Sequence, residues 1–528
     1  MLPNLLKKII LLMKSKYLIL SGLGVAGGMM SQSCKMPGAG KEPERPNIIY
    51  ILADDLGYGE LGVYGQEKIE TPNIDALAKA GMMFTQHYTG APVSAPARNV
   101  LLTGLHTGNS QVRGNHEWGE RGNVWSYHSM LADSTLEGQH PMAEGTITLA
   151  HLLKDVGYNT ALIGKWGLGA PHTHSVPNKM GFDYFMGYNC QRQAHTYYPV
   201  HLYENLNRFY LKNDTVAPHA RLPEGADPYD PDSYAPFNLT DYAPDVLFET
   251  MIRYLNENNP RTTGKPIFLY WATPIPHVPL QAPQHWVDYY VEKFGDEEPY
   301  LGQSGYFPHR NPRAAYAAMV SYLDERVGQL VQQLKDMGVY ENTLIVFTSD
   351  NGPSFSGGDD SPFFDSNNPF LNDYGWSKGF LHEGGIRVPM IASWPGVIEP
   401  GSVTHHTSAF WDVLPTFCEI AGAEFTIETD GISFLPALLG EPQTEHEFLY
   451  WELHEYNGQQ AVRMGNWKAV RKNIFGGNME IELYDLETDI QEQNNLAADY
   501  PDLVAQMEKI MRESHTPAAI EKFNFNFE

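Results

Sequence analysis

The sequence predicts an α/β protein with a large, mainly parallel sheet flanked by helices, followed by a smaller α+β unit. Short continuous apolar runs, such as Ile48 to Leu52, suit strands that are buried on both faces. Helical patterns separate these runs, and alternation of strand and helix is typical of a parallel sheet with both faces covered. Beyond about Gly440 the runs become shorter and β-like, which indicates a second unit.

Residues 46–440 carry the alternating pattern. Thr71-Pro72 supplies a helix cap followed by proline, and Gly81 marks a helix end, so residues 73–80 are predicted to be helical. The other predicted helices are 148–156, 312–337 and 412–420, and the other predicted strands are 160–163, 267–271, 343–347 and 388–393.

Residues 441–528 are predicted to form an α+β subdomain with an antiparallel sheet. Its predicted strands are 448–452, 460–464, 467–471 and 482–485, and its helix is 501–514. Trp451 and Trp467 are interpreted as packing residues, because aromatic side chains bury large apolar surfaces.

The N-terminus has the pattern of an export signal. Residues 1–33 combine a basic stretch from Lys7 to Lys16 with an apolar stretch from Tyr17 to Met30, which is short and glycine-rich for a membrane span. Small residues precede Cys34, so this cysteine is a candidate for lipidation, although Ser31 departs from the usual lipoprotein signal. The alternative is a plain cleaved signal peptide, and residues 34–45 form a linker. We expect an exported protein, in the periplasm or as an outer-membrane-anchored lipoprotein of a Gram-negative bacterium, with membrane contact only through that anchor.

The net charge of −27 argues against nucleic acid as a partner. An anionic small substrate is still compatible with this charge, because screening leaves the few charges that line a pocket to decide the contact. The remaining cysteines, Cys190 and Cys418, have no spacing that suggests a metal site or a disulfide, and we expect ordinary packed thiols.

Polar side chains follow the carboxyl ends of several predicted strands, which is the ligand-binding edge of open α/β sheets. They are Asp54, Asp55, Lys165, His277, Asp350 and Asn351. Asp54, Asp55 and Asp350 are carboxylates and Asn351 is an amide, and these four form a set of hard oxygen donors that suits Ca²⁺ best and Mg²⁺ second. Zinc is disfavoured because the set contains no histidine or cysteine. An isolated Asp-Asp pair could instead cap a helix.

Residues 94–104 read Ser-Ala-Pro-Ala-Arg-Asn-Val-Leu-Leu-Thr-Gly, and this stretch resembles the signature of the sulfatases of the alkaline phosphatase superfamily. In that family a Cys or Ser at the first position is oxidised after translation to formylglycine. The resemblance implies an alkaline-phosphatase-like fold, with Ser94 as both the modified nucleophile and a metal ligand, and with Arg98 stabilising its hydrate. Ala97 stands where the family usually has Ser.

The aldehyde hydrate explains why the modification is useful. It carries two hydroxyls on one carbon: one attacks sulfur, and the other later loses a proton so that sulfate leaves as the aldehyde re-forms. An unmodified serine would be left as a stable sulfate ester. Because the precursor is serine, the resemblance also implies a serine-type maturase that acts before export.

Three further segments carry the resemblance over most of residues 46–440. Lys165, within Gly164 to Gly169, and Lys378, ahead of Glu383 to Pro389, match the family's sulfate-binding lysines. His277, within Pro276 to Pro279, matches the histidine that reaches the sulfate and the leaving oxygen. The sequence leaves open whether His277 or Lys378 is the general acid.

This chain departs from the family pattern at the base that would remove the proton of the hydrate when sulfate leaves. Many relatives have histidine where this chain has Gly167, and that histidine is usually assigned to the formylglycine hydroxyl. His172 and His174 follow a few residues later and are candidates to replace it, although a loop histidine needs no such role.

The segment from Gly181 to Pro199, with its core Gln191-Arg192-Gln193-Ala194-His195, is similar to that of bacterial sulfatases that act on sulfated sugars. The candidate sugar contacts are His195, Arg192, Asp359 and Asp360. We expect a sulfated saccharide substrate, a galactose or N-acetylgalactosamine sulfated at O6 or O4 in a host or dietary glycan. The alternatives are a phosphatase or phosphonate monoester hydrolase of the same superfamily, and a lipoprotein that binds sulfated glycans without turnover.

Overall fold

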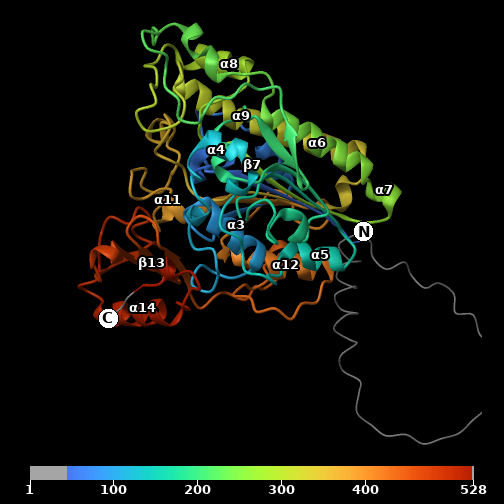
Figure 1. The fold of residues 1–528 in the computed structure, drawn as a ribbon. Coiled ribbons are helices and arrows are strands. Elements are labelled where there is room, and N and C mark those ends of the chain that lie inside the picture. The colour runs from blue at the N-terminus through green and yellow to red at the C-terminus, as the bar shows by residue number, and fades with distance from the viewer. Residues whose placement is uncertain (1–44, 526–528) are drawn as a thin grey trace, which may run out of the picture.

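The computed structural model describes residues 45–525. The predicted signal peptide, Cys34 and nearly all of the predicted linker therefore lie outside the described residues. A large sheet forms the centre of the molecule, with helices on both faces (Figure 1). The prediction of a helix-flanked α/β unit followed by a small antiparallel sheet is confirmed.

The large sheet has eleven strands in the order β10-β2-β9-β8-β1-β7-β3-β4-β5-β6, with β11 beside β2. Its strands are β1 Asn47–Asp54, β2 Met82–Tyr88, β3 Asn159–Lys165, β4 Tyr184–Tyr188, β5 His201–Glu204, β6 Asn207–Tyr210, β7 Ile267–Pro276, β8 Thr343–Ser349, β9 Arg387–Ser393, β10 Ser402–Thr404 and β11 Ser408–Ala409. The run β8-β1-β7-β3-β4 is parallel. Strand β9 is antiparallel to both of its neighbours, β8 and β2. The carboxyl ends of β8, β1, β7 and β3 therefore meet at one edge of the sheet.

Two helical layers cover the sheet. One contains α3 (Ser94–Thr103), α5 (Leu149–Asp155) and α12 (Val413–Ala421), and the other contains α2 (Pro72–Ala80), α6 (Ala243–Glu257), α8 (Gln284–Phe294) and α9 (Pro312–Asp336) (Figure 1). Short helices complete the set: α4 Tyr127–Ala132, α7 Pro260–Thr263, α10 Ser361–Phe364, α11 Glu383–Ile386 and α13 Leu435–Leu438. Within residues 45–525, no helix has the length and apolar character that a membrane crossing requires.

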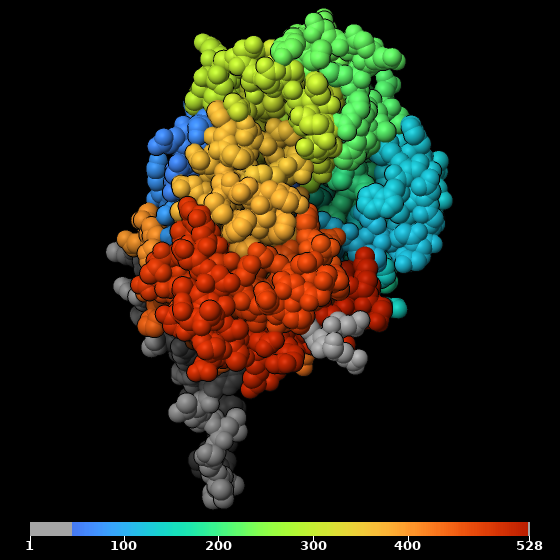
Figure 2. All heavy atoms as spheres, turned by 90° about the vertical axis from the view of Figure 1, so that its left-hand side faces the viewer, coloured from blue at the N-terminus to red at the C-terminus, as the bar shows by residue number. Residues whose placement is uncertain are grey.

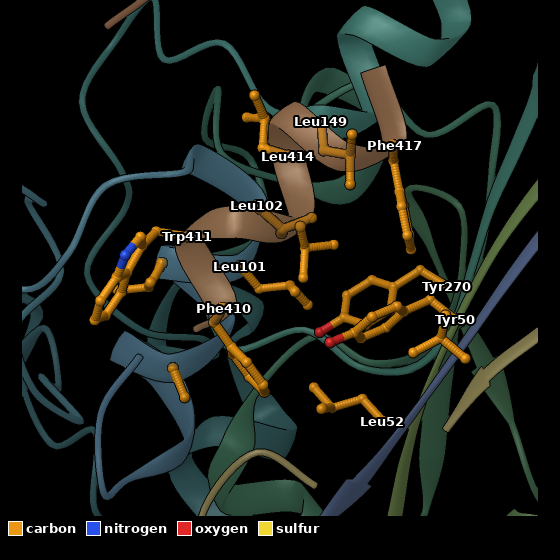
Figure 3. Close-up of a cluster of buried hydrophobic side chains, with 14 of the residues drawn as sticks. Tyr50, Leu52, Leu101, Leu102, Leu149, Tyr270, Phe410, Trp411, Leu414 and Phe417 are labelled. Atoms are coloured by element: carbon orange, nitrogen blue, oxygen red, sulfur yellow. The ribbon is translucent and has the colours of Figure 1, made fainter. Parts of the chain in front are cut away.

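Strand β1 divides the core between the two layers. Its residues alternate, so that Ile48, Tyr50 and Leu52 pack with α3, α5 and α12 while Ile49 and Ile51 pack with the opposite layer. Figure 3 shows the first of these cores, where side chains from α3 and α12 surround the rings of Tyr50 and Tyr270. Every residue of α3 is buried. This packing fixes the helix that begins at Ser94.

A second sheet follows, formed by the antiparallel strands β12 (Leu449–Leu453), β13 (Gln459–Met464), β14 (Trp467–Lys472) and β15 (Ile481–Asp485). Helix α14 (Pro501–Glu513) packs on it, with Met507 and Met511 buried. Figure 2 shows this C-terminal unit, in red, lying directly against the orange part of the larger unit. Trp451 contributes to that interface, because its ring lies 5.4 Å from Tyr88 and 5.6 Å from Trp411. Cys190 and Cys418 are both buried and free.

Candidate active site

The polar residues that follow the predicted strands are brought together at the carboxyl edge of the sheet. Asp54 ends β1, Lys165 ends β3, His277 follows β7, and Asp350 and Asn351 follow β8. All of these side chains are buried. The sheet topology accounts for the arrangement, because neighbouring parallel strands end at the same edge.

Ser94 lies at this cluster as the first residue of α3. Its Oγ donates a hydrogen bond to Oδ1 of Asp54 at 3.0 Å. Asn351 Nδ2 donates to Oδ1 of Asp55 at 2.8 Å, and the backbone N–H of Asp55 donates to Oδ1 of Asp350 at 3.0 Å. Burial and the adjacent charges of Asp54 and Asp55 raise the pKa of Asp350 to about 7.

Two lysines and a histidine face the carboxylates. Lys165 Nζ lies 2.5 Å from Oδ2 of Asp54, and Lys378 Nζ lies 2.6 Å from Oδ2 of Asp55. His277 Nε2 lies 3.7 Å from the same oxygen of Asp55. Burial by itself raises the pKa of Asp54, but Lys165, His277 and Lys378 together hold it below its ordinary value. The site therefore combines three carboxylates with cations suited to an anionic substrate.

The donor set fits a hard divalent cation. Oδ1 of Asn351 is buried without a hydrogen-bond partner, so this amide oxygen remains available as a ligand. His277 also approaches the predicted ligand set, because ligand atoms of Asp54, Asp55 and His277 all lie within 4.8 Å of one another. Oxygen donors still dominate, which is the pattern typical of Ca²⁺ and Mg²⁺.

Arg98 lies one helical turn after Ser94 on α3, so the two side chains share a face of the helix. Its Nη2 donates to Oε1 of Gln191 at 2.7 Å. Sequence reasoning did not single out Gln191 as a site residue, although it lies within the Gln191 to His195 core. Its partner Arg98 is 93 positions away in sequence, so no local pattern could have indicated the contact.

The two histidines considered as replacements near Gly167 are bound elsewhere. His172 Nε2 lies 2.8 Å from Oγ of Ser134, and His174 Nε2 lies 2.7 Å from the carbonyl oxygen of Met142. His172 is exposed, whereas Ser94 is 2% exposed. The structure therefore does not bring either histidine to the nucleophile position.

Among the candidate sugar contacts, His195 lies next to the site and Arg192 contacts other residues. The His195 ring stacks on His277 at 5.6 Å with an interplanar angle of 14°. Arg192 is paired with Glu117 and donates from Nη2 to the carbonyl oxygen of Leu136. The interpretation of Arg192 as a sugar contact therefore stays a prediction, and its contacts with Glu117 and Leu136 do not favour it.

Asp359 and Asp360 line a cavity of about 590 Å³ beside Tyr300 and Arg313. Asp360 is engaged there, because it pairs with Arg313 at 2.7 Å and caps α10 by accepting from the N–H of Phe363. Oδ1 of Asp359, in contrast, is buried without a hydrogen-bond partner. Burial and the charge of Asp55 raise the pKa of Asp359. Of this pair, Asp359 has the freer carboxylate.

Comparison with known proteins agrees with this arrangement. The sulfatase family model matches residues 46–423, and a model described as N-sulphoglucosamine sulphohydrolase, C-terminal, matches residues 372–516. The chain is 31% identical to N-acetylgalactosamine-6-sulfatase of Canis lupus familiaris over 444 residues, which cover 82% of this chain and 73% of that one. It is 32% identical to human arylsulfatase A over 443 residues, covering 80% and 74%. The crystal structure of Ps i-CgsB in complex with k-i-k-neocarrahexaose aligns with a TM-score of 0.70 at 28% identity, covering 90% and 94%.

The fold and the site together define a hydrolase of sulfuric esters. The chain belongs to the sulfatase family.

Proposed function

We propose that this protein removes a sulfate group from O6 or O4 of galactose or N-acetylgalactosamine in a host or dietary glycan, using a formylglycine made from Ser94. The observation that carries the proposal is the position of Ser94. Its Oγ binds Asp54 within the carboxylate cluster, at the buried start of α3, with Arg98 one turn further along. The similarity to N-acetylgalactosamine-6-sulfatase supports the choice of sugar.

We further propose Ca²⁺, with Mg²⁺ as the second choice, as the resident cation. Asp54, Asp55, Asp350, Asn351 and the modified Ser94 would hold it. Such a cation supplies positive charge that offsets the carboxylates and favours the ionised form of a nearby hydroxyl. The oxygen-rich donor set and the free amide oxygen of Asn351 support this choice.

The remaining residues act on the substrate. Lys165 and Lys378 would bind the sulfate oxygens, and the position of both ammonium groups at the carboxylate cluster supports this role. Arg98 stabilises negative charge at the modified Ser94, and a guanidinium stays protonated throughout. A proton for the departing sugar oxygen comes from Nζ of Lys378 or Nε2 of His277, since both atoms lie near Oδ2 of Asp55.

The sugar would lie on the side of His277 where His195 and Asp359 are found. His195 stacks on His277, and Gly357 of the loop carrying Asp359 lies against Val278, the residue after His277. Hydroxyl groups need directional partners, which the His195 ring and the Asp359 carboxylate can provide.

The test is sulfate release from a panel of sulfated galactose, N-acetylgalactosamine and glucosamine compounds, using protein produced together with a serine-type maturase. Mass spectrometry of the peptide that contains Ser94 should show conversion to formylglycine. We expect release from the galacto-configured sulfates and none from the Ser94→Ala protein. Cleavage of gluco-configured or aryl sulfates alone would contradict the proposed sugar. Release that survives Ser94→Ala would contradict the mechanism. Formylglycine without any release would indicate a different sulfated substrate, whereas a Ser94 left unmodified by the maturase, without release, would indicate a glycan binder.

We also propose that the protein is exported and anchored through a lipid on Cys34. The sequence of residues 1–34 supports this, with its basic stretch, its apolar stretch and the small residues before the cysteine. Metabolic labelling with a fatty acid should mark the natural protein and leave the Cys34→Ala protein unlabelled. A label that is absent from both, on a protein cleaved before residue 34, would indicate a plain signal peptide.

A further inference from the structure

Arg98 is a buried cation held by a neutral partner. Its side chain is 2% exposed, and its hydrogen bond at 2.7 Å goes to the amide oxygen of Gln191. Within residues 45–525, no carboxylate forms an ion pair with Arg98. A buried arginine is normally paired with an acid, because an unpaired charge is costly to remove from water. The charge of Arg98 acts on Asp54 and Asp350 without a direct ion pair, so the guanidinium remains available to an anionic group in the site.

Gln191 is connected to both ends of the nucleophile helix turn. It begins the 3-10 turn Gln191–His195, and its backbone N–H donates to Oε1 of Gln139 at 3.1 Å. Its Nε2 faces Oδ1 of Asn115 at 3.5 Å, and that same oxygen accepts the N–H of Ala95 at 2.9 Å. Ala95 is the residue after Ser94, so one side chain links Arg98 to the backbone beside the nucleophile.

Asn115 is fixed in turn by the C-terminal unit. Its backbone N–H donates to Oε1 of Glu455 at 3.0 Å, and Glu455 follows strand β12. The oxygen and nitrogen of the Gln191 amide are thus assigned by two partners of opposite character. The amide oxygen accepts from Arg98, and the amide NH2 group donates to Oδ1 of Asn115. The orientation of this amide is therefore determined by its surroundings.

Gly167 supplies the space that Gln191 occupies. A Cβ atom built on Gly167 would lie 2.4 Å from Cγ of Gln191 and 2.9 Å from Nη2 of Arg98, both far inside van der Waals contact. The φ of Gly167 is also +68°, in the left-handed region that favours glycine. Any side chain at position 167 would therefore compete with the Gln191–Arg98 contact.

We propose that Gln191 is a positioning residue for the reaction: its amide oxygen fixes the Arg98 guanidinium beside Ser94 without neutralising it, and Gly167 makes this contact sterically feasible. The inference deepens the proposed function and rests on it for the reaction that Arg98 serves. The side chain at position 191 that contacts Arg98 must therefore be a hydrogen-bond acceptor, and it must be uncharged.

Two substitutions separate these features. Gln191→Met keeps a similar volume and removes the acceptor, and we expect kcat to fall roughly tenfold with KM within about twofold. Gln191→Glu keeps an acceptor oxygen but places a negative charge against Arg98, and we expect kcat to fall about 100-fold, as when a charge-stabilising donor is lost. The matched control is Gln193→Met. Gln193 is also buried in the same turn but contacts His201 instead, so the kcat of the Gln193→Met protein should stay within about twofold of wild type.

A second measurement does not depend on turnover. Crystal structures of the wild-type and Gln191→Met proteins should show the Arg98 guanidinium displaced in the variant. Displacement together with the loss in kcat supports the inference. An Arg98 that stays in place, or a Gln191→Met protein with unchanged kcat, overturns it.

If the wild-type protein releases no sulfate from any substrate, the proposed function fails, and the position of Arg98 alone then decides the inference. Should Gln191→Met not fold, the kcat of Gln191→Glu decides it, and an unchanged value overturns the inference.

Discussion

Lys468 of the C-terminal sheet forms an ion pair with Glu383 of the larger unit, with Nζ and Oε1 2.9 Å apart and neither side chain exposed. Glu492 lies at the same distance from Nζ. Burial and the charge of Glu383 raise the pKa of Glu492 to about 7, although Lys468 acts in the opposite direction. Glu383 is therefore the main anionic partner of Lys468. Because Glu383 begins α11, shortly after Lys378, this pair connects the C-terminal unit to the active-site segment.

The first prediction concerns Lys468→Met. Removing the cation leaves the buried Glu383 with only Arg387 and Arg463 to compensate its charge, and breaking one side of such a pair costs about 3–5 kcal/mol. We expect the free energy of unfolding, measured by urea denaturation, to fall by that amount. Lys472→Met is the control, because Lys472 lies on the same strand but pairs with Glu482 near the surface. It should cost below about 1 kcal/mol, and equal losses in the two variants would contradict the prediction.

The second prediction concerns how the stabilisation of the folded protein by Glu383 depends on pH. Burial alone raises its pKa, but Lys468, Arg387 and Arg463 outweigh burial and lower it to about 2. A carboxyl whose pKa is lower in the folded protein stabilises it above the unfolded pKa, near 4.5, and loses this effect as the pH falls toward 2. Glu383→Gln should therefore cost about 3 kcal/mol at pH 7, and progressively less below about pH 4.5.

Urea denaturation between pH 7 and pH 3.5 checks this dependence. The exposed Glu399 provides the control, since Glu399→Gln should change the free energy of unfolding little at any of these pH values. A cost of Glu383→Gln that stays constant down to pH 3.5 would be inconsistent with a lowered pKa of Glu383.

The third prediction concerns removal of the proposed cation. Asp54, Asp55 and Asp350 are buried together, and their mutual repulsion is relieved when a divalent cation binds. A ligand present at about 100 times its Kd stabilises the folded state by about 2.7 kcal/mol. We therefore expect chelation to lower the unfolding temperature by several degrees, and Ca²⁺ to restore it more fully than Mg²⁺. The Asp350→Asn protein should respond more weakly, and a wild-type unfolding temperature indifferent to chelator would count against the metal.

The fold was predictable where burial is complete and local signals agree. All eight residues of β1 are buried, so its apolar run indicates a strand by itself. Helix α2 begins at Pro72 and its C-cap is Gly81, as the capping pattern predicted. Strand β2 was missed because it is partly exposed and mixes polar with apolar residues, and helix α3 was missed because Ser94 and Pro96 do not look helical. Proline fits there, because the first turn of a helix needs no donor from it.

The site was predictable to the extent that sheet topology determines it. Asp54, Lys165 and His277 follow different strands, and strand order brings them to one edge. Contacts between distant loops were not predictable: Arg192 was assigned to the sugar, yet Glu117 holds it, whereas Gln191, the residue beside it, reaches Arg98. Neighbouring residues on a 3-10 turn point in different directions, and only the three-dimensional packing decides which one faces the site.

The last prediction separates the two candidates for the general acid. Nδ1 of His277 lies 2.5 Å from the carbonyl oxygen of Val278, which can only accept, so the proton of a neutral ring is on Nδ1 and Nε2 is an acceptor. Lys378, in contrast, has protons on the atom that faces the site. Lys378 is therefore the better donor to the departing oxygen.

A leaving group that needs no proton should reveal this difference. With a sugar sulfate, we expect Lys378→Met to lower kcat at least about 100-fold, and with 4-nitrophenyl sulfate considerably less, because nitrophenolate leaves without protonation. His277→Gln should lower kcat for both substrates by a similar factor. If His277→Gln instead shows the larger loss with the sugar sulfate and Lys378→Met affects both substrates alike, the proton comes from His277, and the bond from Nδ1 to Val278 must be exchanged during turnover.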